Sequence, residues 1–169
     1  MEENNIRDES LTDESLTWDE YFMSIANLVR LRSKDPITKV GACIVKDNKI
    51  LSTGYNGFPK GLSNEDYPWT KGNSDETKNK FYYVVHAELN AIINADNSIK
   101  ESTLYVTKFP CNECAKAIIQ SDISKVIYLS ESSDEKLSKK FLIVSKMLKD
   151  ANIEVVQYIN TFKEIKIIT

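Results

Sequence analysis

Residues 103–129, TLYVTKFPCNECAKAIIQSDISKVIYL, predict a strand, a helix and a second strand in direct succession, which is the pattern of an α/β fold. The same alternation continues toward the C-terminus. The predicted elements are the strand Thr103–Thr107, the helix Cys111–Ser121, the strand Lys125–Leu129, the helix Asp134–Lys149 and the strand Ile153–Tyr158. Because the last helix is long enough to return the chain along the sheet, we predict that the last two strands are parallel.

The part of the chain before this stretch predicts a helix, a hairpin and a second helix. Their ranges are Thr17 to about Arg32 for the first helix, Val40–Val45 and Ile50–Tyr55 for the hairpin strands, and His86 to about Ala95 for the second helix. Thr17 followed by Glu20 is a capping box, which marks a helix start. The polar residues 46–49 predict the hairpin turn. Strands that alternate with helices indicate an α/β fold with helices on both faces of the sheet.

Composition and charge are those of a soluble globular protein. The chain has 169 residues, 41% hydrophobic and 28% charged, which is enough for a buried core, and we predict one domain over residues 17–169. Residues 1–16 hold six carboxylates, one arginine and no aromatic residue, which predicts a disordered acidic tail.

The net charge of residues 17–169 is only slightly positive, which argues against a nucleic acid polymer as a partner. With no apolar run of membrane-spanning length and no signal-peptide pattern, we expect a cytoplasmic protein that does not bind a membrane.

Residues 56–80 predict a long loop, because turn-forming residues interrupt every apolar run. Five glycines and prolines stand among polar residues there: Gly57, Pro59, Gly61, Pro68 and Gly72. A loop of this length in a compact domain usually has a function or is mobile.

Two motifs at predicted helix starts carry the chemistry. The one histidine of the chain lies in His86-Ala87-Glu88, and Pro110-Cys111-Asn112-Glu113-Cys114 follows a strand at the start of the next helix, where the amide hydrogen that Pro110 lacks would have no partner. Cys111 and Cys114 are three residues apart, so they face the same way on a helical turn. Helix N-termini stabilise the thiolate that binds metal. One imidazole and two thiolates predict a tetrahedral Zn(II) site whose fourth position is open to water, which is typical of catalysis.

Glu88 is the candidate proton carrier of this site. It lies two residues after the histidine, so its side chain points in a different direction from the helix axis. It is therefore free to transfer protons instead of binding metal. Each motif alone has ordinary explanations, because a histidine at a helix start often caps or packs, and paired cysteines also form redox dithiols. Together the two motifs favour zinc. Cys43 lies in a predicted strand and is expected to be buried. Because the chain has no other histidine and Cys43 is its one remaining cysteine, we predict no second zinc site.

HAE followed by PCxxC is the signature of zinc-dependent deaminases. Further segments resemble the deoxycytidylate deaminases of that superfamily, over about residues 18–130: RSKDP (32–36), VGACIV (40–45), GYNGFPKG (54–61), HAELNAI (86–92), LYVTKFPCNECAK (104–116) and KVIYLS (125–130). The resemblance implies a three-layer α/β/α fold around a mixed five-stranded sheet. It also implies one Zn(II) per chain, held by His86, Cys111 and Cys114.

The activity that the resemblance implies is hydrolytic removal of the 4-amino group of dCMP, which gives ammonia and dUMP for thymidylate synthesis. Glu88 would move the protons. Asn56 would bind the sugar, and the backbone at Ala87, together with Pro110, would contact the base.

The 5′-phosphate of such a substrate needs cations. Arg32 and Lys34 are the candidates, because an arginine holds a phosphate with two hydrogen bonds. The same two charges are equally what a solvated helix end carries, and the sequence leaves both interpretations open.

Regulation is a further implication, since similar deaminases are typically homohexamers activated by dCTP with Mg(II) and inhibited by dTTP. The segment involved would be Gly57-Phe58-Pro59-Lys60-Gly61, continuing to Trp69. Glycines allow backbone to approach phosphates, Lys60 supplies a cation, and Phe58 and Trp69 offer aromatic surface. An ordinary surface loop also shows these features.

A second loop differs from the pattern of the deaminases that this chain resembles. The loop Glu131-Ser132-Ser133 is shorter than theirs, so closure over the nucleotide is expected to differ.

Two other functions fit part of the pattern. A nucleobase or tRNA adenosine deaminase shares HAE and PCxxC, but RSKDP and GYNG favour a mononucleotide substrate. A catalytically silent, deaminase-like binding subunit would have no use for Glu88. Ammonia release from dCMP, dCTP, cytidine and adenosine discriminates among these functions.

Overall fold

The computed structural model describes residues 15–72, 74–130 and 135–159, with only the backbone described for residues 135–138. Most of the predicted acidic tail, the short loop Glu131-Ser132-Ser133 and residues 160–169 lie outside these ranges. The single domain over residues 17–169 therefore stays a prediction.

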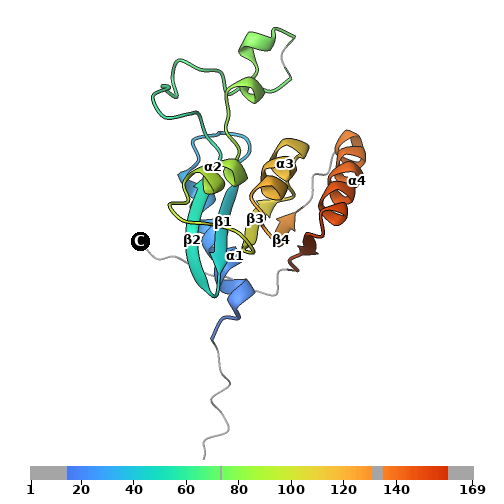
Figure 1. The fold of residues 1–169 in the computed structure, drawn as a ribbon. Coiled ribbons are helices and arrows are strands. Elements are labelled where there is room, and N and C mark those ends of the chain that lie inside the picture. The colour runs from blue at the N-terminus through green and yellow to red at the C-terminus, as the bar shows by residue number, and fades with distance from the viewer. Residues whose placement is uncertain (1–14, 73, 131–134, 160–169) are drawn as a thin grey trace, which may run out of the picture.

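Helices and strands alternate along the chain as the sequence predicts (Figure 1). In chain order they are α1 (Trp18–Val29), η1 (Arg30–Arg32), β1 (Gly41–Lys46), β2 (Lys49–Tyr55), η2 (Glu76–Lys78), η3 (Lys80–Tyr82), α2 (Ala87–Ile93), β3 (Thr103–Lys108), α3 (Asn112–Gln120), β4 (Lys125–Ser130), α4 (Glu135–Asp150) and β5 (Glu154–Gln157). The elements marked η are single 3₁₀ turns. The first helix thus changes from α to 3₁₀ geometry before it ends at Arg32, a tightening that is frequent at helix ends.

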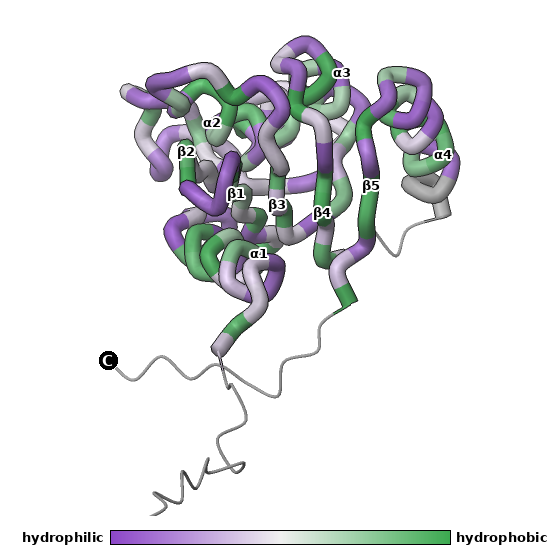
Figure 2. The backbone as a smooth tube through the Cα atoms, turned by 60° about the horizontal axis from the view of Figure 1, so that its bottom comes forward, coloured by the Kyte–Doolittle hydropathy of each residue, from purple (hydrophilic) through white to green (hydrophobic). Residues whose placement is uncertain are grey.

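The five strands form one mixed sheet in the order β2-β1-β3-β4-β5 (Figure 2). β1 pairs antiparallel with both β2 and β3, whereas the pairs β3–β4 and β4–β5 are parallel. The prediction that the last two strands are parallel is confirmed. Each parallel pair needs a crossover connection, which α3 and α4 supply.

Helix α1 covers one face of the sheet. Its start is the predicted capping box, in which Glu20 N–H donates to Thr17 Oγ1 at 3.3 Å and Thr17 N–H donates to Glu20 Oε2 at 2.7 Å. The buried side of the helix and the sheet face beneath it form one apolar cluster: Phe22, Met23, Ala26, Cys43, Val45, Tyr105 and Ile127. Cys43 is fully buried, as expected, and burial raises the pKa of its thiol to about 12.

Helices α2, α3 and α4 lie on the opposite face, as Figure 2 shows. Successive strand residues point to opposite faces, so Ala42 and Ile44 pack under these helices while Cys43 and Val45 pack under α1. The second cluster also contains Ala87, Ala91, Leu104, Val106, Ala115, Ile118, Val126, Val144 and Leu148. Two apolar cores on one sheet make the three-layer α/β/α fold, and they explain why the strands are apolar on both sides.

The hairpin turn is shorter than the sequence predicts. β1 extends to Lys46 and β2 begins at Lys49, so Asp47 and Asn48 alone form the turn. Their φ values are 50° and 57°, the left-handed conformation that two-residue hairpin turns need and that Asp and Asn tolerate.

Gly54 allows α2 to lie directly on β2. A Cβ atom at this position would be 2.3 Å from both Ala87 O and Ala91 N, closer than any side chain can approach. Ser52 Oγ also donates to Ala91 O at 2.5 Å, and Asn90 Nδ2 donates to Tyr55 O at 2.7 Å. The start of α2 is therefore held firmly against the hairpin.

The long loop extends beyond the end of the sheet near α2, at the top of Figure 1. Phe58 and Trp69 stack with ring centroids 4.1 Å apart, and Tyr67 packs against Phe58 and Tyr83. The two rings predicted to offer aromatic surface are thus half-buried against each other. Among the helices of the described ranges, none is both long and apolar enough to cross a membrane.

Candidate functional site

The starts of α2 and α3 face each other, and each begins with a predicted metal ligand. His86 is the N-cap of α2 and Cys111 is the N-cap of α3. The sequence predicts that this helix begins at Cys111, but the structure has it begin one residue later, at Asn112, with Cys111 as the N-cap and Pro110 before it. The reason is that Cys111 has extended backbone, with φ −78° and ψ 172°, and its Sγ accepts the Cys114 N–H at 3.5 Å.

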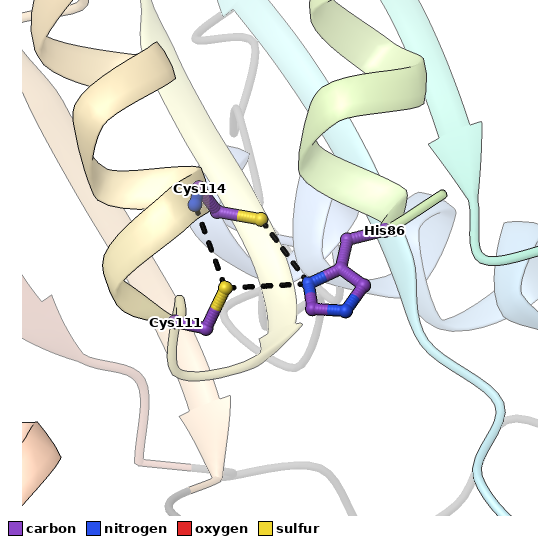
Figure 3. Close-up of side chains that lie close together, drawn as sticks. All are labelled: His86, Cys111 and Cys114. Atoms are coloured by element: carbon purple, nitrogen blue, oxygen red, sulfur yellow. Dashed lines mark hydrogen bonds between the residues drawn. The ribbon is translucent and has the colours of Figure 1, made fainter. Parts of the chain in front are cut away.

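The three predicted ligands converge (Figure 3). His86 Nδ1 is 3.3 Å from Cys111 Sγ and 3.3 Å from Cys114 Sγ. All three ligand atoms lie within 4.8 Å of one another. Nitrogen and sulfur ligands of a tetrahedral zinc ion stand about 3.6 Å apart, given usual bond lengths. The donor set and its spacing therefore fit Zn(II) with one position left for another ligand.

The protonation of the two thiols supports the same conclusion. Hydrogen bonds with Cys114 and His86 lower the pKa of the Cys111 thiol to about 3 against the effect of its burial. The hydrogen bond to Cys111, together with burial, raises the pKa of Cys114. The hydrogen bond with Cys111 likewise raises the pKa of His86. Cys111 is therefore a thiolate, and Cys114 keeps the proton that the two sulfur atoms share. A divalent cation that binds both sulfur atoms would displace this proton.

Glu88 lies in the first turn of α2 and is only 4% exposed. Burial raises the pKa of its carboxyl above the ordinary value, and a hydrogen bond with its own backbone N–H and the nearby His86 partly offset this effect. A hydrogen bond links its side chain with that of Cys114. A carboxyl group that is held next to the ligands and binds protons more readily than usual is suited to proton transfer.

Asn56 lies beside His86. An antiparallel bridge joins Gly57 to Val85, with Gly57 N–H donating to Val85 O at 3.1 Å and Val85 N–H donating to Gly57 O at 2.9 Å. The residue before Gly57 is therefore the cross-strand neighbour of the residue after Val85. Asn56 is 5% exposed. Ala87 and Pro110, the other residues predicted to contact the substrate base, are buried next to His86 and Cys111.

The segment RSKDP alternates between buried and exposed side chains. Ser33 and Asp35 are each 1% exposed, and Ser33 Oγ donates to Asn56 O at 2.8 Å. Arg32 and Lys34 are exposed. The buried residues hold the segment beside Asn56 and leave the two cations open to solvent.

The residues predicted to bind an effector lie along the long loop. Gly57 forms the bridge to Val85, whereas Lys60 and Gly61 are exposed. Gly61 has φ +93°, a conformation that favours glycine.

Two residues of this region, Asp35 and Lys80, are not predicted from the sequence as site residues. Lys80 Nζ lies 2.5 Å from Asp35 Oδ2, and both side chains are buried. The sequence offers no signal for this pair, because burial of a charged residue depends on partners far along the chain. Asp35 stands within a quoted motif, but Lys80 is one of several lysines in its segment.

Comparison with known proteins agrees with this geometry. Residues 16–130 match the cytidine and deoxycytidylate deaminase zinc-binding region. The chain is 45% identical over 161 residues to a probable deoxycytidylate deaminase of Drosophila melanogaster, covering 91% of this chain and 78% of that protein. It is 48% identical over 135 residues to the deoxycytidylate deaminase of Homo sapiens, covering 77% and 76%.

The fold of this chain is also similar to that of a deaminase of known structure. The crystal structure of dCMP deaminase from the cyanophage S-TIM5 in complex with dCMP and dUMP aligns with a TM-score of 0.64 and 31% identity, over 82% of this chain and 95% of that one. Residues 16–130, which match the family's zinc-binding region, include both helix starts and the three ligands that converge there. The chain therefore belongs to the family of cytidine and deoxycytidylate deaminases that this zinc-binding region defines.

Proposed function

We propose that this protein is a zinc-dependent dCMP deaminase, which hydrolyses dCMP to dUMP and ammonia. The observation that carries the proposal is the convergence of His86, Cys111 and Cys114 within 4.8 Å, with the buried carboxyl of Glu88 against them. The choice of dCMP is supported by the names of the relatives and by the cyanophage enzyme, which was crystallised with dCMP and dUMP.

The reaction replaces an amino group with oxygen, and the chain supplies the proton transfers. When bound, zinc supplies the Lewis acidity that activates a water for attack on carbon 4 of cytosine. Glu88 accepts a proton from this water and donates it to ring nitrogen 3. It then moves the second proton of the water to the departing amine. Water and dCMP are thus converted to dUMP and ammonia, and Glu88 ends in its starting state.

The remaining site residues would orient the nucleotide. Asn56 lies next to His86, where a sugar attached to the base can reach it. The backbone at Ala87 and the buried Pro110 flank the ligands and would border the pyrimidine ring.

Ammonia release tests the proposed function directly. The zinc-loaded protein is assayed side by side with dCMP, dCTP, cytidine and adenosine. We expect dCMP to be deaminated with the highest kcat/KM. Preference for adenosine would favour the nucleobase or tRNA deaminase alternative, and no release from any substrate would favour a binding subunit.

Arg32 and Lys34 are the proposed phosphate ligands, since both cations are exposed on a segment fixed beside Asn56. Replacing Arg32 with alanine should raise KM for dCMP about tenfold or more, because a charge-assisted phosphate contact is lost. KM for deoxycytidine, which has no phosphate, should change little. Lys39→Ala, which removes an exposed cation three residues after the end of RSKDP, is the control. Equal losses with both substrates would assign Arg32 a structural role.

Control by nucleotides is the second part of the proposal. We propose a homohexamer that dCTP activates with Mg(II) and dTTP inhibits, with Gly57, Lys60 and Gly61 in the effector region. The exposed Lys60 and the positive φ of Gly61 support a phosphate contact at this loop. The dCMP saturation curve should be sigmoidal, become hyperbolic with dCTP and shift to higher dCMP with dTTP. A monomer by sedimentation, or a curve indifferent to both nucleotides, would contradict this regulation.

A further inference from the structure

A buried ion pair lies beside the candidate substrate site and has no part in the chemistry described above. Lys80 Nζ is 2.5 Å from Asp35 Oδ2, and the two side chains are 5% and 1% exposed. The residues are 45 positions apart in the chain. Burying two charges costs solvation energy that their attraction often only balances, so such a pair is weak support for stability by itself. Its contacts indicate another role.

The Asp35 carboxylate is saturated with hydrogen-bond donors. Oδ1 accepts the Ile37 and Thr38 N–H groups at 2.9 and 3.0 Å, and Oδ2 accepts from Lys80 Nζ and, at 3.3 Å, from Asn56 Nδ2. Burial opposes ionisation, but the hydrogen bonds from Lys80, Thr38 and Ile37 outweigh it and lower the pKa of Asp35. The group therefore stays a carboxylate, which accepts hydrogen bonds and donates none.

This carboxylate fixes the orientation of the Asn56 amide. Nδ2 donates one hydrogen to Asp35 Oδ2 and the other to Thr38 O at 2.9 Å, while Oδ1 accepts the Val40 N–H at 2.8 Å. Turning the amide over would set Oδ1 against two acceptors and Nδ2 against a donor. Both amide hydrogens are thus committed within the protein. Among the described residues, the Val40 N–H alone donates to Oδ1, which leaves one lone pair of this oxygen. Asn56 can offer a ligand only an acceptor.

The free lone pair is on Oδ1 of Asn56, which is the cross-strand neighbour of the candidate metal ligand His86. The deoxyribose of dCMP carries a single free hydroxyl group, at the 3′ position, because the 5′ oxygen is esterified. That hydroxyl is a hydrogen-bond donor, so it matches a fixed acceptor.

We propose that Lys80 and Asp35 are positioning residues that hold Asn56 as an acceptor for the sugar hydroxyl of the substrate; this inference rests on the proposed function. Lys80 neutralises Asp35, and Asp35 sets the amide of Asn56. Without Lys80, the buried carboxylate takes up a proton or turns toward water, and the amide loses the partner that orients it.

Two substrates that differ in one hydroxyl test this role. They are dCMP and its 2′,3′-dideoxy analogue, and the measured quantity is the ratio of their kcat/KM values. In the wild-type chain we expect the dideoxy analogue to be poorer by about tenfold or more, because a buried acceptor loses its donor. In Lys80→Met the ratio should fall to within about threefold, mainly through loss of activity on dCMP. Equal losses on both substrates would leave the ratio unchanged and would overturn the proposal.

A second variant guards against misfolding. Asp35→Asn combined with Lys80→Met removes both charges at once, so that no buried charge remains unpaired. It should show the same reduced ratio with normal zinc content. Lys125→Met is the matched control, because Lys125 pairs with Glu154 at 3.0 Å at the other end of the parallel strands. We expect it to keep the wild-type ratio.

Hydrogen exchange of the Asn56 side-chain amide provides a readout that needs no turnover. Its two hydrogens, assigned by NMR with Asn56→Asp, should exchange slowly in the wild-type chain and about tenfold or more faster in Lys80→Met. Unchanged exchange would overturn the positioning role even if activity fell. A wild-type chain with protected hydrogens but no dCMP turnover would instead contradict the proposed function and leave the positioning of Asn56 supported.

Discussion

Replacing Glu88 with glutamine should lower kcat for dCMP by about 10²- to 10⁴-fold or more, while the zinc content of the protein stays normal. Glutamine has nearly the same shape as glutamate, so the first turn of α2 and the three metal ligands should remain in place. It cannot accept the proton of the attacking water or return one to the leaving amine. Ammonia release measures the activity, and metal analysis measures the zinc.

The matched control for this variant is Glu113→Gln. Glu113 lies in the first turn of the other ligand helix, α3, but it is exposed and pairs with Lys116 at 2.6 Å. An exposed ion pair contributes little, so activity should change by less than about twofold. A Glu88→Gln variant that keeps its turnover would mean that another group moves the protons.

Replacing Cys111 with serine should remove zinc and, with it, all measurable deamination. Cys111 has two roles, because its Sγ faces His86 Nδ1 and also accepts the Cys114 N–H as the N-cap of α3. Serine is a strong N-cap residue, so the helix keeps its cap, while the soft thiolate ligand that zinc prefers is lost. Changing a group that merely supports a ligand costs metal affinity about 10- to 100-fold, and loss of a ligand should cost more.

Metal analysis after dialysis checks this prediction. We expect about one zinc per chain in the wild type and almost none in Cys111→Ser or in Cys114→Ala. The control is Cys43→Ala, which removes the remaining thiol of the chain from the core beneath α1. It should lose some thermal stability because it leaves a small cavity, but it should keep its zinc. Full zinc content in Cys111→Ser would contradict the three-ligand site.

Zinc should also stabilise the fold. A metal that binds only the folded chain raises its free energy of unfolding, so the melting temperature should fall when a chelator is added to the wild type. In Cys111→Ser, which has no zinc to lose, the chelator should have no effect. This difference separates metal removal from other effects of the chelator.

Features with a local cause are predicted well from the sequence. The capping box at Thr17 lies within one turn of helix, and its contacts appear as expected. The parallel pairing of β4 and β5 follows from the length of the helix that connects them. The boundaries are less accurate: α3 begins at Asn112 instead of Cys111, and the hairpin turn is Asp47-Asn48, because side-chain capping and backbone twist decide the end residues.

The family could be recognised from the motifs that resemble its members, the order of helices and strands from hydrophobic periodicity, and the three candidate metal ligands from their spacing, because all of these signals are local in the chain. The pairing of β3 with β1 as well as β4, and the contact of Lys80 with the Asp35 carboxylate that binds Asn56, are seen in the folded chain alone. Both contacts join residues far apart in the chain. A lysine in a polar loop is normally solvated, and it is buried here because the fold brings a carboxylate to it that must be neutralised.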